Sequence, residues 1–113
     1  MVNDLYTQIE AKNRELQQSV KLLRKIGTDL ATAERDYKVL LRQEILKLRD
    51  EGVAVGVIDK ICYGIPSVAD ARFKRDVAEV TYKANLEFIN STKLQLRLLE
   101  EQLKREWGAE LDD

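Results

Sequence analysis

The side chains of this sequence that could bind a phosphate are Arg72, Lys74 and Arg75 in the segment "ARFKRD". Guanidinium and ammonium groups make charge-assisted hydrogen bonds to phosphate oxygens. Before them, Ile58 and Ile61 lie three residues apart, Gly64 forms a turn and a serine follows as a helix cap. This order resembles a helix-turn-helix, which places its second helix in the major groove of DNA. Phosphate contact is therefore one hypothesis for this segment.

Several features of the same segment weaken the helix-turn-helix interpretation. Asp59 occupies a tightly packed position where the motif usually has a small residue, and Gly64 comes one residue late. The second helix would begin "VADA", which is apolar and acidic where Arg, Asn or Gln would read bases. The formal net charge of −1 shows no excess of basic residues. Nucleic-acid binding therefore stays an alternative that is not favoured.

Other chemistry is limited by the residue types present. The sequence has no histidine, which is the usual general base and the commonest metal ligand. A Cys-His nucleophile and a Cys/His zinc site are therefore impossible, and no glycine-rich phosphate loop occurs. The single cysteine, Cys62, lies among apolar residues, where a buried small side chain is a better interpretation than a nucleophile. We expect no enzyme activity, no cofactor and no metal.

A first long helix is predicted over residues 3–51. Between Asn3 and Asp50 there is no proline and one glycine, and apolar residues recur every seven positions from Ile9 to Tyr37. A spacing of seven keeps one side of a helix toward a partner helix when the two supercoil. This region is therefore expected to be one helix of a coiled-coil-like pair.

A second long helix is predicted over residues 67–107. Ser67 is expected to cap its start, with Asp70 in the first turn as in a capping box. Gly108 is expected to end it, and the tail 108–113 is acidic and predicted to fray. Near the end of this helix, Trp107 is either a lid over the open end of the helix pair or an interface anchor. Apolar residues again recur at sevens, from Tyr82 to Leu103.

The two rows predict an all-α antiparallel helical hairpin that forms a single domain, 1–113. Pairing Tyr37 with Tyr82 places the middle of the hairpin between Asp59 and Lys60. We call the residues of the two rows that should meet the seam: Leu16, Leu23, Leu30, Tyr37, Tyr82, Ile89, Leu96 and Leu103. Two helices alone enclose no core, so part of each seam side chain should stay wet.

Apolar residues near the bend that lie outside the seam predict self-association. Helices that are apolar on two sides need a further layer to cover them. We therefore expect a homo-oligomer, most simply a dimer that makes a four-helix bundle near the bend. The expected oligomer interface comprises Leu41, Ile45, Phe73, Val77, Val80 and Phe88.

The bend, residues 52–66, admits three interpretations. It forms a short helix or tight apolar cap, a partner-binding tip or the DNA reader described above. "VAVGVI" also has strand propensity, so a small β-turn is a further alternative to the short helix. A cap with exposed apolar surface could dock another protein. The residues of such a tip would be Val55, Ile58, Ile61, Tyr63 and Ile65.

Two segments, "AERDYKVLLRQEILKLRDEGVAVGVIDK" and "ADARFKRDVAEVTYKANLEFINSTK", resemble a group of small helical proteins encoded by phages and prophages of Gram-positive bacteria. The resemblance spans residues 34–93 and implies a phage context, with no activity or catalytic residues attached to it. We therefore expect a non-enzymatic scaffold or protein–protein interaction module that binds a host or phage protein. The alternative is a nucleic-acid accessory, comparable in shape to the Gam-type inhibitors of host nucleases.

The expected location is the cytoplasm, that of the host cell if the chain is phage-encoded. The N-terminus lacks the basic start and apolar run of a secretory signal, and no apolar window approaches the ~20 residues needed to span a bilayer. A lone cysteine also fits a reducing compartment. No membrane is expected as a partner.

Overall fold

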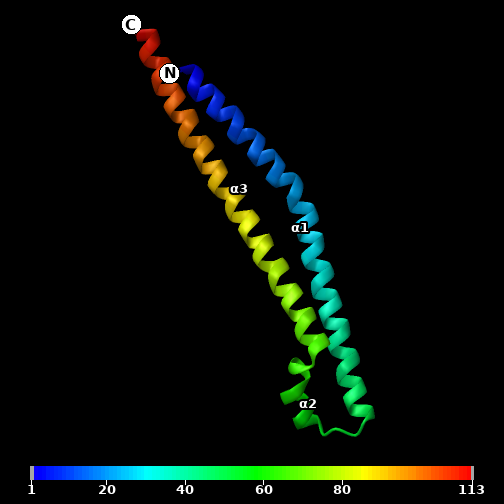
Figure 1. Cartoon of the computed structure of the whole chain (residues 1–113). Coiled ribbons are helices and arrows are strands. Elements are labelled where there is room, and N and C mark those ends of the chain that lie inside the picture. The colour runs from blue at the N-terminus through cyan, green and yellow to red at the C-terminus, as the bar shows by residue number, and fades with distance from the viewer. Residues whose placement is uncertain (1, 113) are drawn as a thin grey trace. The chain divides into compact units, whose positions relative to one another are not determined.

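The computed structural model describes residues 2–112, with side chains up to residue 109, and all of its regular structure is helical (Figure 1). A pair of long helices dominates it: α1 over Val2–Asp50 and α3 over Pro66–Asp112. Between them lie the short helix α2, Val55–Ile61, and a turn of 3₁₀ helix, η1, Cys62–Gly64. No strand occurs within residues 2–112, so the all-α prediction is confirmed and α2 replaces the alternative β-turn.

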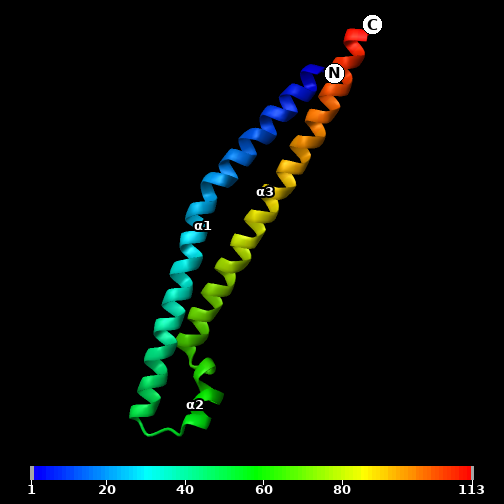
Figure 2. The same cartoon turned by 180° about the vertical axis from the view of Figure 1, so that it is seen from behind.

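The described chain divides into two compact units. The bend unit comprises Lys25–Tyr82, and the terminal unit comprises the described residues up to 24 and from 83 onward. Both views show the loop after α1 leading through α2 to the start of α3 inside the bend unit (Figures 1 and 2).

A glycine-dependent cap ends α1. Gly52 has φ +83, and its N–H donates to the Arg49 carbonyl at 3.0 Å. The N–H of Val53 donates to the Leu48 carbonyl at 3.1 Å. These two hydrogen bonds form a Schellman motif, which satisfies carbonyls that the last helical turn leaves without partners. Only glycine adopts this positive φ without steric cost, so Gly52 sets the direction in which the chain leaves α1.

Two glycines in the bend should respond in opposite ways to alanine. Gly52→Ala should lower the free energy of unfolding by about 1 kcal/mol, because alanine disfavours a positive φ. Gly56→Ala should raise it by up to about 1 kcal/mol, because Gly56 lies inside α2 and a Cβ there meets nothing within 4 Å. Urea titration followed by circular dichroism measures both. Equal effects of the same sign would contradict the cap.

The start of α3 differs from the predicted serine cap. The N–H of Ala69 donates to the Ile65 carbonyl at 2.8 Å, and α3 begins at Pro66. Ile65 is therefore the N-cap, and Pro66 takes the first helical position, where its missing N–H would have had no partner in any case. Ser67 lies inside the helix, so the prediction that it caps α3 is wrong.

The end of α3 also differs from the prediction. The helix continues through Gly108 to Asp112, whereas the sequence predicts a stop at Gly108. A glycine inside a helix costs about 1 kcal/mol relative to alanine, which the hydrogen bonds of the turns on either side offset. The predicted frayed tail, 108–113, is helical over its described part, and Asp113 lies outside the described residues.

Contacts between α1 and α3 occur inside each unit. In the bend unit a Cβ on Gly27 would lie 3.5 Å from the Tyr82 ring, and the Arg75 guanidinium stacks 4.7 Å from the centre of the Tyr37 ring. In the terminal unit the Asn85 side-chain amide donates to the Ser19 carbonyl at 3.2 Å. These contacts hold the two long helices together within each unit.

Each unit has a small core. Tyr37, Ile58, Cys62 and Val68 are buried in the bend unit, and Val68 is fully enclosed. In the terminal unit the buried residues are Leu5, Ser19, Ile89, Thr92 and Leu96. Fully burying an apolar side chain of this size contributes roughly 1.5–3 kcal/mol. The bend unit therefore depends on a few side chains from α1, α2 and α3.

Candidate interaction surfaces

The predicted seam residues lie in the interior to different degrees. Tyr37, Ile89 and Leu96 are buried. The other five, Leu16, Leu23, Leu30, Tyr82 and Leu103, are half-buried. None of the eight is among the exposed apolar side chains. Within a single chain, two helices leave one edge of each contact residue in water, which accounts for the five half-buried side chains.

The predicted oligomer interface is mostly exposed. Phe73 and Val80 are 68% and 67% exposed, and Val77 is about half exposed. These three residues follow one another along α3 at helical spacing, and we call them the α3 apolar face. They line a hollow of about 330 Å³ together with Asp76 and Thr81. The α3 apolar face is a continuous apolar surface of the bend unit.

The remaining residues of the predicted interface lie elsewhere. Leu41 and Ile45 of α1 are half-buried, so they offer less surface than the α3 apolar face. Phe88 is also exposed, and it belongs to the terminal unit. Within the predicted oligomer interface, the exposed apolar surface of the bend unit is therefore formed by Phe73, Val77 and Val80.

The predicted tip separates into a buried and an exposed part. Ile58 is 2% exposed and belongs to the core of the bend unit, so it offers no surface to a partner. Val55, Ile61 and Tyr63 are exposed, whereas Ile65 is half-buried. Because α2 turns Ile58 inward, the apolar surface of the tip comprises Val55, Ile61 and Tyr63, together with Val57, which the sequence does not single out.

Two of the three candidate phosphate contacts, Arg72 and Arg75, interact with side chains of the same chain. The Arg75 guanidinium pairs with Asp76 at 2.8 Å and stacks on Tyr37. The Asp76 hydrogen bond raises the pKa of Arg75 above its ordinary value, so this side chain stays charged. The Arg72 guanidinium lies 5.6 Å from the centre of the Tyr63 ring, within cation–π range. Lys74 points toward α1 and lines a groove.

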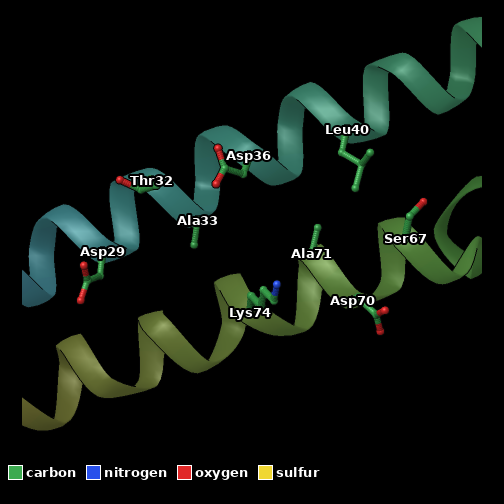
Figure 3. Close-up of a pocket in the computed structure, with 9 residues that line it drawn as sticks. All are labelled: Asp29, Thr32, Ala33, Asp36, Leu40, Ser67, Asp70, Ala71 and Lys74. Carbon is green, nitrogen blue, oxygen red and sulfur yellow. The ribbon is translucent and has the colours of Figure 1, made fainter.

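That groove, of about 370 Å³, lies in the bend unit between α1 and α3 (Figure 3). Ala33 and Leu40 of α1 and Ala71 of α3 point into it, while Asp70 points away from α1. Two of its carboxylates pair along their own helix, Asp29 with Lys25 and Asp36 with Arg35. Its acidic groups therefore do not converge on one point. Among the described residues, no three Asp, Glu or Cys side chains are placed to hold a metal ion.

Searching the described helices finds none with an apolar stretch of the length and low charge that a bilayer crossing needs. Comparisons of the chain with protein-family models, with curated proteins and with solved structures found no match.

Proposed function

We propose that the chain is a non-enzymatic protein–protein interaction module that self-associates through the α3 apolar face. The observation that carries this proposal is the row of Phe73, Val77 and Val80, which leaves large apolar side chains in water on successive turns of one helix. Single exposed apolar residues are ordinary, but contiguous apolar surface marks interaction sites in folded proteins. Covering the row removes apolar area from water at roughly 25 cal/mol per Å².

The scaffold that presents this face is, in our proposal, an antiparallel hairpin of α1 and α3. Two contacts within the bend unit support it. Gly27 of α1 lies beside Tyr82 of α3. Tyr37, ten residues after Gly27, lies beside Arg75, which is seven residues before Tyr82. From one contact to the next, the residue number rises along α1 and falls along α3, as it does in antiparallel helices. In the terminal unit, the Asn85 side-chain amide of α3 donates to the Ser19 carbonyl of α1, which is a contact between the same two helices.

A dimer is the simplest assembly that would cover the face. The second copy supplies the same apolar row, and two hairpins then form a four-helix bundle at the bend end. The exposed tip residues Val55, Ile61 and Tyr63 stay available for a different protein. The resemblance to phage-encoded helical proteins makes a host or phage protein in the cytoplasm of the host cell the partner that we propose.

Catalysis has no part in this proposal. The absence of histidine removes the commonest general base. The lone thiol of Cys62 is buried in the bend unit, where no substrate reaches it in the folded chain. Binding through surfaces is therefore the activity that the residues of this chain support best.

Sedimentation equilibrium tests the self-association directly. At micromolar concentration we expect a species of twice the 13.0 kDa chain mass, converting to monomer on dilution. A protein that stays monomeric over this range contradicts the dimer. For the second partner, a pull-down from host lysate compares the wild-type chain with Ile61→Asp, which alters the exposed tip without entering the core. A partner retained equally by both chains excludes the tip as its binding site.

A further inference from the structure

Arginines and apolar residues alternate along one exposed side of α1 in the bend unit. Val39 is 50% exposed and Leu46 is 43% exposed. Arg35, Arg42 and Arg49 are also exposed, and they recur every seven residues. We call these five residues the α1 outer row. It is a second surface of the bend unit, carried by a different helix from the α3 apolar face.

The helical period places the α1 outer row opposite the packed side of α1. At about 100° per residue, its five members fall within about 80° of one another around the helix axis. Tyr37, Leu41 and Leu48 are buried or half-buried, and they lie about 160–200° around the axis from Val39. Figure 3 shows Leu40 pointing from α1 into the groove beside α3. The packing within the unit therefore leaves the outer row uncovered.

The α1 outer row carries positive charge that the chain does not neutralise. The Arg35 guanidinium pairs with Asp36 at 3.1 Å. Among the described residues, neither Arg42 nor Arg49 has an ion pair. Residues 35–50 contain five basic and three acidic side chains, so this stretch has a net charge of +2, whereas the chain as a whole has −1. The local charge favours an acidic partner.

The spacing of the row favours a helix as that partner. Its members follow one another at alternating distances of four and three residues, which is the spacing of the positions that meet a second helix in a coiled coil. Arginine is enriched at protein interfaces, and its guanidinium binds a carboxylate through two parallel hydrogen bonds. A helix that covers the row would therefore place apolar side chains against Val39 and Leu46, and carboxylates against the arginines.

We propose that the α1 outer row binds a helix of another protein, one whose contact side alternates apolar residues and glutamates at spacings of three and four. The α3 apolar face of a second copy does not have this chemistry, because Phe73, Val77 and Val80 bring no carboxylate to the arginines. Nucleic acid fits the row less well, because a phosphate backbone gives Val39 and Leu46 no apolar contact. A bilayer also fits less well, because arginines interrupt the apolar surface that would enter it.

Designed peptides of about three heptads test this specificity. The Leu–Glu peptide alternates leucine and glutamate at spacings of three and four, with alanine and glutamine elsewhere to favour a helix. One control has lysine in place of glutamate, and a second has the Leu–Glu composition in scrambled order. Fluorescence anisotropy of labelled peptide, titrated with the full chain, should show saturable binding of the Leu–Glu peptide alone. Raising the salt from about 50 to about 300 mM should weaken it, because exposed charges are screened.

Variants of the chain locate the binding site. Arg42→Glu should weaken binding of the Leu–Glu peptide by about fivefold, because an exposed ion pair is replaced by a repulsion. Lys60→Glu makes the same charge change at an exposed residue of α2 in the bend unit and should leave the affinity unchanged. Val39→Glu should also weaken peptide binding by at least about fivefold while self-association continues as in the wild type. The outer row and the dimer can therefore fail independently.

Three results would overturn the proposal. The first is equal binding of the Leu–Glu and scrambled peptides, or of neither. The second is an affinity for the Leu–Glu peptide that Arg42→Glu does not change, because the peptide then binds elsewhere on the chain. The third is tighter binding of a 20-base-pair DNA duplex, or of vesicles that contain anionic lipid, than of the Leu–Glu peptide, with Arg42→Glu weakening it. That result would assign the row to nucleic acid or to a membrane surface.

Discussion

Ile58→Asp is expected to lower the free energy of unfolding by at least about 3 kcal/mol. Ile58 is 2% exposed, so the substitution removes a buried apolar side chain and places a carboxylate in the core of the bend unit. Tyr37, Cys62 and Val68 are the other buried residues described in this unit, and none of them is basic. The aspartate would therefore have no cation to pair with in that core. Urea titration followed by far-UV circular dichroism measures the loss.

The matched control is the next residue toward the N-terminus. Val57 lies in the same short helix but is 47% exposed, so Val57→Asp should change the free energy of unfolding by no more than about 0.5 kcal/mol. If the two variants unfold at the same urea concentration, the burial of Ile58 in the core of the bend unit is contradicted.

The second large effect concerns association. Phe73→Glu combined with Val80→Glu should weaken the proposed dimer by at least about 100-fold. Aromatic side chains at interface centres often contribute 2 kcal/mol or more, and in a two-fold dimer each substitution acts twice. Both side chains are more than half exposed, so the folded chain should keep its helical circular dichroism. Sedimentation at a series of concentrations gives the dissociation constant.

A change on α1 serves as the control for the association experiment. Val39→Glu introduces the same charge at an apolar residue of the bend unit that is 50% exposed and lies outside the α3 apolar face. Its dissociation constant should match that of the wild-type chain. If the double variant also associates like the wild type, the α3 apolar face is not the interface.

The sequence predicts the long helices well because their signal is local and repeated. Apolar residues at sevens, from Leu16 to Tyr37 and again from Tyr82 to Leu103, lie in the interior or at its edge. The same spacing cannot identify Ser19 and Thr92, which are buried although they are polar. Their burial depends on which residues the other helix places opposite them, and one helix's period does not contain that information.

The ends of the helices were harder to predict, because several residues there compete for the same role. Pro66 and Ser67 are both start signals, and the proline takes the first helical position. Gly52 and Gly108 are both stop signals, yet only Gly52 has the positive φ that a Schellman cap requires. The sequence does not give the φ of a glycine. Whether a glycine caps a helix or lies inside it therefore depends on the surrounding structure.

The surfaces were predictable in composition but not in orientation. The apolar spacing of Phe73, Val77 and Val80 is evident in the sequence, and the structure exposes all three. The apolar tip is evident too, yet Ile58 turns inward and Ile61 outward. The sequence does not single out Tyr6, because this residue belongs to no apolar repeat. In the terminal unit it lines a hollow with Trp107, which is 52% exposed and therefore not a buried lid.

The distance between Gln18 and Glu87 tests the antiparallel pairing of α1 and α3 most directly. Both residues are exposed in the terminal unit and flank the hydrogen-bonded Ser19 and Asn85. Spin labels on cysteines at these sites, in a Cys62→Ala chain diluted with unlabelled protein, report the distance within one molecule. Paired helices, whose axes lie about 8–10 Å apart, predict a separation below about 30 Å once label linkers are added. A separation near 100 Å, the length of 69 residues in one unbroken helix at about 1.5 Å each, would contradict the hairpin.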